Sequence, residues 1–162
     1  EIEATMVRVR RQLPDVAWRT TFIVGFPTET DQDFEELVDF VSEGHFQHLG
    51  IFLYSDEDNI RSSKFGDPIP LSLKEERKNR LMEIQQKISR EHHQKMVGSL
   101  QQVLVGGFSS ETDLLLEGRN QYQGPEVDGV VYINEGNATS AGFHQVEITE
   151  AHEYDLVGKI LN

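Results

Sequence analysis

Residues 25–33 carry the groups best suited to chemistry, a glycine–proline turn followed by a run of carboxylates. Gly25 allows a close backbone approach, and a helix that begins just after such a turn can bind an anion. Glu29, Asp31 and Asp33 already place negative charge at that helix start, so an anion would be repelled. The turn therefore favours a neutral or cationic ligand. An ordinary capped turn without a ligand is the alternative.

The turn follows an apolar strand and precedes a helix. Residues 22–24 (Phe-Ile-Val) are typical of a parallel strand covered on both faces, and we expect this strand at about 18–26. Thr30 is a suitable N-cap, and Asp33 completes a capping-box pattern for a helix at about 31–43. Because α/β folds place ligands where strands end and helices begin, the turn is a candidate ligand edge.

A second buried strand is expected at about 48–54, and a helix at 2–13 precedes the first strand. Tyr54 could line the same edge as the turn, or it could pack under the following loop. The order of elements predicts a parallel βαβ unit, and two strands do not make a stable parallel sheet alone. We therefore expect a partial parallel α/β barrel of the TIM-like kind, in a chain that is a C-terminal fragment of a longer protein.

A long helix is expected to follow the irregular, proline-containing segment 55–71. Ser72 and Glu75 form a capping-box pattern, which predicts a helix over residues 73–97 with Gly98 as its C-cap. At 1.5 Å per residue this helix would be about 37 Å long, which is enough to connect two domains.

The remaining chain switches to the periodicity of strands. Turn residues separate five short apolar segments, so we expect a small five-stranded, closed antiparallel barrel that resembles an oligonucleotide-binding fold. The segments are 100–107, 112–118, 129–133, 144–150 and 154–161. The predicted division is an α/β domain (1–72), a linking helix (73–97) and the barrel domain (98–162).

The barrel segment is strongly acidic. The whole chain has a net charge of -13, and residues 98–162 contribute -8, because only Arg119 and Lys159 are cationic there. Binding nucleic acid requires cations that neutralise phosphates, so the charge favours a basic protein partner over RNA. Acidity that merely keeps the domain soluble is the alternative. We assign the recruitment of a basic partner to four carboxylates of the barrel, Glu126, Asp128, Glu147 and Asp155.

The sequence offers few groups for a metal. It has no cysteine, and its six histidines lack the spacing of zinc sites. The acidic segment 56–59 lacks the glycine and the distal glutamate of a calcium loop. We expect no metal site. Because no apolar run approaches the ~20 residues of a membrane span and no signal peptide is visible, we expect no membrane contact and a cytoplasmic location.

Several segments, in order, resemble the methylthiotransferases of the radical S-adenosylmethionine superfamily. They are TFIVGFP at 21–27, LGIFLYS at 49–55, KEERKNRLMEIQQKIS at 74–89, PEVDGVVY at 125–132 and YDLVG at 154–158. The tail resembles the TRAM domain of that family. The last two segments most resemble the branch that modifies an aspartate of a small-subunit ribosomal protein. Two departures are Thr28, where the family usually has glycine, and the loop 56–61.

The resemblance implies a cofactor edge and a substrate. It places near bound S-adenosylmethionine the residues Gly25, Phe26, Pro27, Glu29 and Tyr54. The family cleaves this cofactor at a [4Fe–4S] cluster held by three cysteines, which this chain lacks, so the chain alone is expected to be inactive. The implied partner is a basic small-subunit ribosomal protein. A transfer-RNA adenosine methylthiotransferase and a non-catalytic acidic protein-binding module are the alternatives.

Overall fold

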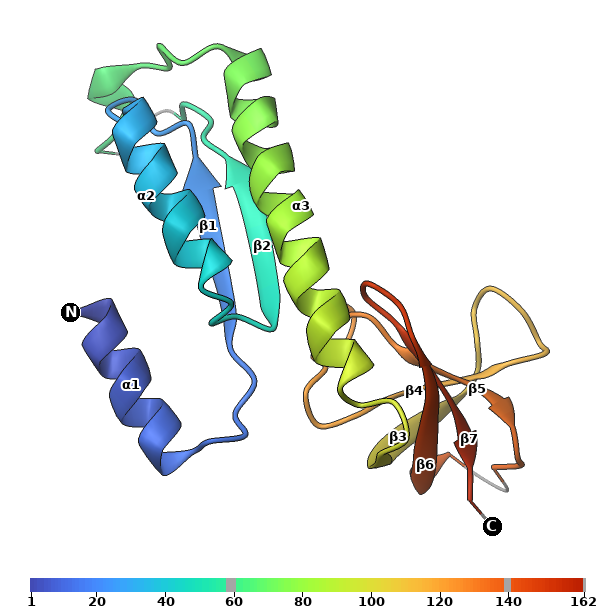
Figure 1. Cartoon of the computed structure of the whole chain (residues 1–162). Helices are drawn as coiled ribbons and strands as arrows, with labels where there is room; N and C mark the ends of the chain where they lie inside the picture. The colour runs from blue at the N-terminus through green and yellow to red at the C-terminus, as the bar shows by residue number, and fades with distance from the viewer. Residues whose placement is uncertain (58–60, 139–140, 162) are drawn as a thin grey trace.

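The computed structural model describes residues 1–57, 61–138 and 141–161, and it shows an α/β part and a barrel connected by one long helix (Figure 1). Two strands of the α/β part pair in parallel, from Arg19 opposite His48 to Val24 opposite Leu53. The predicted parallel βαβ unit is therefore confirmed, whereas its place in a larger barrel stays a prediction. Its elements are α1 (Ile2–Gln12), β1 (Arg19–Val24), α2 (Asp31–Ser42) and β2 (His48–Leu53).

The helix after the turn begins where the capping pattern predicts. The Thr30 hydroxyl accepts a hydrogen bond from the Asp33 amide at 3.1 Å, and the Asp33 carboxylate accepts one from the Thr30 amide at 2.8 Å. This reciprocal capping box satisfies two amides that a helix start leaves free. The helix ends at Ser42, and Gly44 follows the C-cap residue Glu43 with a φ of 72°. The apolar face of α2 packs on the sheet through Phe34, Val38 and Val41.

The long helix α3 (Leu71–Gln94) follows a short 3-10 turn at Ser63–Phe65. It starts from Pro70 without a side-chain cap, so the predicted capping box of Ser72 and Glu75 is wrong. Ser72 already lies within the first helical turn and cannot act as its N-cap. Beyond the helix, the Gly98 amide donates to the Ile148 carbonyl at 2.8 Å, which connects the end of the helix to the barrel.

The buried stripe of α3 is mostly polar. Leu81 is completely buried and packs with Val24 and Phe34, but it is the one apolar member of the stripe. A helix on a protein surface ordinarily buries an apolar stripe. The buried residues of α3 are Lys74, Arg77, Leu81, Gln85, Ser89 and His93.

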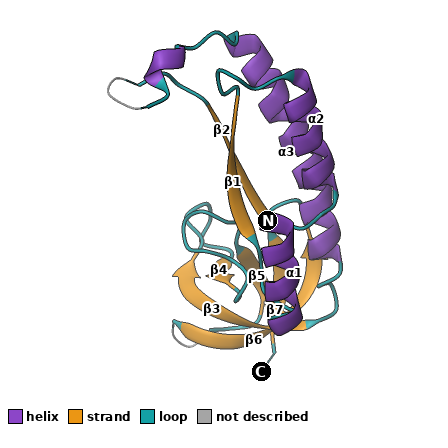
Figure 2. Cartoon of the chain, turned by 90° about the vertical axis from the view of Figure 1, so that its left-hand side faces the viewer, coloured by secondary structure: helices purple, strands orange, loops and turns teal. Residues whose placement is uncertain are grey.

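Five strands close into a barrel in the order β3-β4-β5-β7-β6 (Figure 2). All neighbours are antiparallel except β5 and β7, which are parallel, so the predicted purely antiparallel barrel is wrong. The reason is geometric, because strand direction cannot alternate throughout a closed ring with an odd number of strands. The strands are β3 (Leu100–Phe108), β4 (Leu116–Arg119), β5 (Val131–Glu135), β6 (Gly142–Ala151) and β7 (Leu156–Ile160).

The barrel interior is filled by branched apolar side chains. Inward-facing positions alternate with exposed ones along β3 and β6, as the period of a strand requires. At Gly129 the chain passes so close to the neighbouring loop that a Cβ would lie 1.8 Å from the Tyr154 carbonyl oxygen. The core residues are Val103, Val105, Val131, Ile133, Val146, Ile148, Leu156 and Ile160.

The barrel contacts the amino ends of β1 and β2, whereas the predicted ligand edge lies at their carboxyl ends (Figure 1). A strand of six residues separates the two ends by roughly 20 Å. The long helix α3 runs beside both ends, with its first turns near the ligand edge and its last turns at the barrel.

Candidate functional site

The turn after β1 is closed by its own side chains. Gly25 has a φ of 78°, and its amide donates to both carboxylate oxygens of Glu29 at 3.1 Å. The Glu29 amide donates in turn to the Phe26 carbonyl at 2.8 Å. A Cβ on Gly25 would lie 2.4 Å from Cγ of Lys74. Glycine is therefore required here by the backbone conformation and by the lysine stem, not by space for a ligand.

Two buried cations of α3 contact the ends of both strands. The Lys74 ammonium donates to the Tyr54 carbonyl at 2.8 Å and pairs with Asp67. Arg77 is 3% exposed, and its guanidinium bonds Glu29 at 2.5 Å and Asp31 at 2.6 Å. Because a buried charge is tolerated only when it is paired, these contacts fix the cations and the turn together.

Aromatic rings cover the same edge. The Tyr54 ring is 8% exposed and meets the exposed Phe26 ring edge to face, with 5.3 Å between centroids. Phe65 packs on the other side of Phe26 at 6.3 Å. Among the described residues the buried Tyr54 hydroxyl has no hydrogen-bond partner. Such a group costs about 1–3 kcal/mol when it stays unpaired, so a polar atom of a ligand would be stabilised beside it.

The structure thus brings together the predicted residues of the edge. Gly25, Phe26 and Glu29 lie in one turn, Pro27 is inside it, and Tyr54 lies beside it at the end of β2. Their contact with a cofactor stays a prediction. Sequence reasoning missed Lys74 and Arg77, although their spacing with Leu81 on one helical face indicated that both lie toward the core.

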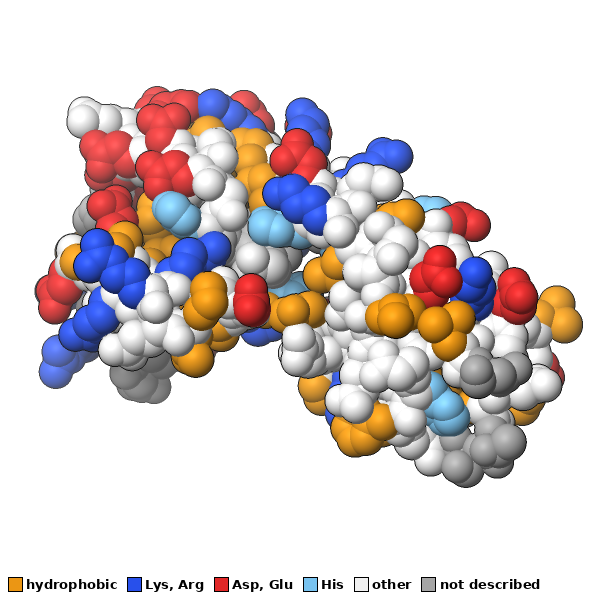
Figure 3. Space-filling model, turned by 60° about the horizontal axis from the view of Figure 1, so that its bottom comes forward, with side chains coloured by type: hydrophobic (Ala, Val, Ile, Leu, Met, Phe, Trp, Pro, Cys, Tyr) orange, Lys and Arg blue, Asp and Glu red, His pale blue; other side chains and the backbone are white. Residues whose placement is uncertain are grey.

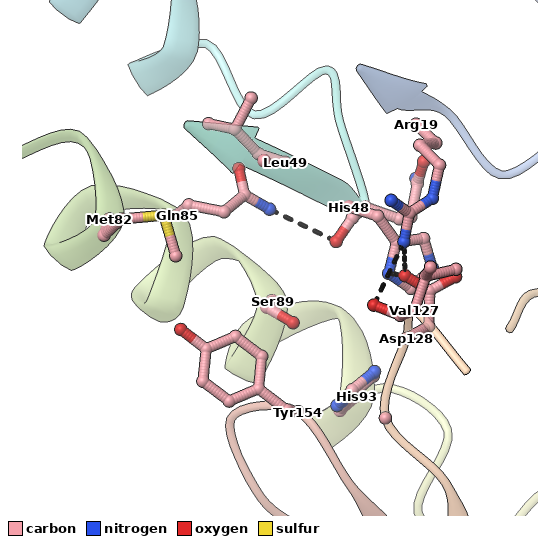
Figure 4. Close-up of a pocket in the computed structure, with 13 residues that line it drawn as sticks. Arg19, His48, Leu49, Met82, Gln85, Ser89, His93, Val127, Asp128 and Tyr154 are labelled. Atoms are coloured by element: carbon pink, nitrogen blue, oxygen red, sulfur yellow. Dashed lines mark hydrogen bonds and ion pairs between the residues drawn. The ribbon is translucent and has the colours of Figure 1, made fainter. Parts of the chain in front are cut away.

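A second cluster lies at the opposite end of the strands, where the barrel meets the sheet (Figure 4). Arg19 and His48, the first residues of β1 and β2, both contact the Asp128 carboxylate, whose side chain is 4% exposed. The distance from Nδ1 of His48 to this carboxylate is 3.0 Å, and Nε2 lies 2.8 Å from the Tyr122 carbonyl. A cavity of about 270 Å³ lies beside the cluster, between α3 and the barrel.

The environment of His48 opposes its protonation. Burial lowers the pKa of His48, the Tyr122 carbonyl raises it, and the charges of Arg19, His93 and His92 lower it further. The net direction is a pKa below the ordinary value of 6.5. Both ring nitrogens of His48 nevertheless face acceptors, the Asp128 carboxylate and the Tyr122 carbonyl.

Three of the four predicted recruitment carboxylates have partners within the chain. Asp128 also accepts the Gly124 amide at 2.7 Å, and Asp155 accepts the Val130 amide at 2.9 Å. Glu147 forms an ion pair of 3.2 Å with Lys159. Among the described residues, Glu126 alone of the four is exposed without such a partner. Asp128 and Asp155 thus have structural roles, and recruitment by these residues stays a prediction.

Another acidic face surrounds Tyr132, which lies opposite Glu117 on neighbouring strands. Partial burial and the carboxylates of Glu111, Asp155 and Glu117 raise the pKa of Tyr132, which indicates a negative potential at this outer face. The loop before β4 carries the exposed Leu114. Figure 3 shows lysine and arginine side chains interspersed with carboxylates over the α/β part, and carboxylates beside exposed apolar groups and few cations on the barrel.

Neither a metal cluster nor a membrane helix is found within the described ranges. No group of three or more His, Cys, Asp or Glu side chains there could hold a metal ion. The segment 56–59 lies partly outside those ranges. None of the described helices is long and apolar enough to cross a membrane.

Residues 97–161 match the TRAM domain, which fits the closed five-stranded barrel. The chain is 48% identical over 161 residues to the ribosomal protein uS12 methylthiotransferase RimO of Bdellovibrio bacteriovorus, covering 99% of this chain and 35% of that protein. It is 45% identical over 162 residues to the protein of the same name from Desulfotalea psychrophila, covering 100% and 37%.

The barrel is therefore a TRAM domain. Along nearly its entire length, the chain is similar to proteins named as methylthiotransferases. The protein of Geobacter sulfurreducens with the same printed name is 40% identical over 162 residues. The chain spans about a third of the length of these curated relatives.

Proposed function

We propose that the chain is part of an enzyme that methylthiolates an aspartate of ribosomal protein uS12. The observation that carries this proposal is the 48% identity, over 99% of the chain, to a relative named as a uS12 methylthiotransferase. The methylthiolation of a ribosomal protein implies a cytoplasmic location. The α/β part would contribute one edge of the radical S-adenosylmethionine barrel, and the TRAM domain would recruit the substrate.

The edge at the carboxyl ends of β1 and β2 fits the adenosyl part of S-adenosylmethionine. Phe26 offers an exposed ring, and the unpaired Tyr54 hydroxyl offers a hydrogen-bonding group. Gly25, Pro27 and Glu29 would shape the turn that presents Phe26. When bound, the cofactor supplies the radical that abstracts hydrogen from the substrate. The ligands of the [4Fe–4S] cluster would come from outside this chain, which has no cysteine.

The TRAM domain fits a basic protein partner. Its net charge of -8 and the carboxylates around Tyr132 produce a negative potential, and Glu126 adds an exposed carboxylate. Of its two cations, Lys159 is already paired with Glu147. Transfer RNA is the weaker candidate, because phosphate contacts need unpaired cations.

The distance between the two sites constrains how a substrate binds. The TRAM domain lies at the amino ends of the strands, roughly 20 Å from the proposed cofactor edge. A protein recruited by the barrel must therefore extend a segment along the α/β part to reach the cofactor. An extended segment of about six residues covers this distance.

The test is binding and modification by the full-length protein that the gene encodes. We expect tight, salt-sensitive binding of uS12, weak binding of transfer RNA, and a methylthio group on one aspartate detected by mass spectrometry. Glu117→Gln should weaken uS12 binding more than Glu147→Gln, because Glu147 is already neutralised by Lys159. Equal or tighter binding of transfer RNA at physiological salt would overturn the proposal. If the gene lacks a Cys-x3-Cys-x2-Cys motif, only the non-catalytic binding module remains.

A further inference from the structure

We propose that Arg77 and Lys74 are positioning residues of the cofactor edge, acting from α3 on the ends of both strands. This inference rests on the proposed function, because it assigns a purpose to contacts at that edge. Neither residue is placed to touch the reacting atoms, since each is almost completely buried behind the turn.

Arg77 acts through Glu29. Its guanidinium holds the Glu29 carboxylate at 2.5 Å, and that carboxylate accepts the Gly25 amide with both oxygens. The other end of the guanidinium fork bonds Asp31 at 2.6 Å, on the far side of the helix cap. The fork therefore fixes the position of the Gly25 amide, and Phe26 is the next residue in the chain.

Lys74 acts on both strand ends at once. Its ammonium donates to the Tyr54 carbonyl at 2.8 Å and lies 5.5 Å from the centre of the Tyr54 ring. Its aliphatic stem fills the space beside Gly25. One side chain thus sets the separation between the turn after β1 and the tyrosine after β2, which are the two groups proposed to hold the cofactor.

Simple packing does not explain two cations in these positions. Leu81 lies on the same face of α3, where it is fully buried against Val24 and Phe34. Apolar side chains at positions 74 and 77 would hold the helix to the sheet without the desolvation cost of a buried charge. What the cations add is direction, because the guanidinium fork and the ammonium fix particular oxygen atoms in place.

The chain contains a matched control for Arg77. Arg80 lies one turn later on α3, forms a two-bond ion pair with Glu35 at 2.5 and 2.7 Å, and stacks on the same Phe34 ring. The centroid of that ring is 5.2 Å from the Arg77 guanidinium and 5.5 Å from that of Arg80. Among the described contacts, Arg80 makes none with the turn after β1, so its loss removes an arginine pair without disturbing the edge.

The experiment compares Arg77→Gln with Arg80→Gln in the full-length protein that the gene encodes. Two readouts are measured, the Kd for S-adenosylmethionine by calorimetry and hydrogen exchange of the peptide covering residues 22–30 without cofactor. We expect Arg77→Gln to raise the Kd roughly 10- to 100-fold and to speed exchange at Gly25. Arg80→Gln should change neither by more than about twofold. The Kd and the exchange rate of Arg77→Lys should lie between those of Arg77→Gln and the unaltered protein, because lysine keeps the charge but not the guanidinium fork.

Each outcome decides the inference. If Arg77→Gln folds and binds the cofactor as tightly as the unaltered protein, the positioning role is wrong. If Arg77→Gln does not fold, Glu29→Gln is measured instead, since Arg77 then keeps Asp31 as its partner. An unaltered protein that does not bind S-adenosylmethionine refutes the proposed function, while unchanged exchange at Gly25 in Arg77→Gln refutes the positioning role separately.

Discussion

The two ends of the parallel strands are both closed by ion pairs, but the pairs differ in kind. At the carboxyl ends, a 3%-exposed arginine and a buried lysine hold one strand-end turn and one backbone carbonyl. At the amino ends, one buried carboxylate of the barrel meets a histidine and Arg19, whose side chain is 44% exposed. In the first arrangement both cations are buried, although the Asp31 side chain that pairs with Arg77 is 94% exposed. The second arrangement depends on the protonation of His48, and its arginine, Arg19, is partly exposed to water. We therefore expect the contact between the barrel and the sheet to be the weaker of the two.

The largest expected effect is at the carboxyl end. Arg77→Leu leaves the Glu29 carboxylate, which is 11% exposed, without its cation. Removing one partner of a buried pair costs about 3–5 kcal/mol of the free energy of unfolding. Chemical denaturation measures this loss in the free energy of unfolding. The exposed pair of Arg80 and Glu35 provides the comparison, and Arg80→Leu should cost less than about 1 kcal/mol. Equal losses would show that the carboxyl end is not specially stabilised.

A smaller loss is expected when a side chain is added to the turn. Gly25→Ala forces a left-handed φ of 78° on alanine and places its Cβ 2.4 Å from the Lys74 stem. The backbone alone costs roughly 1–2 kcal/mol, and displacement of the lysine adds to it. Gly66→Ala is the control, because its φ is 63° and nothing lies within 4 Å of the new Cβ. The difference between the melting temperatures of Gly25→Ala and Gly66→Ala measures the cost of displacing Lys74. Equal melting temperatures would show that the Lys74 stem does not restrict the turn.

At the amino end, Asp128→Asn should loosen the barrel rather than unfold it. The substitution removes the charge that Arg19 and His48 share, and we expect a loss of about 1–3 kcal/mol. Faster proteolysis and hydrogen exchange in residues 120–130, with unchanged exchange in the barrel core, would show that the contact between the barrel and the sheet has loosened. Glu126→Gln is the control, since this exposed carboxylate lacks a described partner and should change stability by less than about 0.5 kcal/mol.

The smallest effect is the pH dependence of the junction. The pKa of His48 in the folded chain is lowered from 6.5, chiefly by burial, so the unfolded chain binds more protons between the two values. Stability should therefore fall as the pH decreases below about 6.5, by less than 1.4 kcal/mol per unit. Burial and Lys95 lower the pKa of His92 in the same direction. Denaturation from pH 7 to 5 should show a shallower slope for His48→Gln, and an unchanged slope would exclude His48 as the titrating group.

Local features and the parallel pairing of β1 with β2 could be predicted from the sequence, whereas the long-range ion pairs could not. The capping box of Thr30 and Asp33 and the turn at Gly25 depend on residues within a few positions of one another. The contact of Arg77 with Glu29 spans 48 residues, and that of Arg19 with Asp128 spans 109. A charged residue in a helix is ordinarily expected to face solvent, so the partner of Arg77 was not foreseen although its spacing with Leu81 placed it on the buried face.

The barrel shows the same division. Turn residues separated its five strands well enough to predict a closed barrel, although β4 begins at Leu116 because residues 113–115 form a turn. The odd number of strands alone requires one parallel pair in the barrel, but only the structure shows that this pair is β5 and β7. The burial of Asp128 could not be predicted, since it results from how the TRAM domain contacts the sheet.

The polar stripe of α3 has a consequence for movement. Lys74, Arg77, Gln85 and His93 each bond a partner that lies at one height along the helix. Gln85 bonds the carbonyls of Phe46 and Gln47, and His93 bonds that of His152. A slip of one turn, about 5.4 Å, would break these bonds and the Arg77 contacts simultaneously. The helix α3 therefore keeps a constant distance between the α/β part and the TRAM domain. We expect any displacement of the TRAM domain to come from bending after Gln94, where the helix ends.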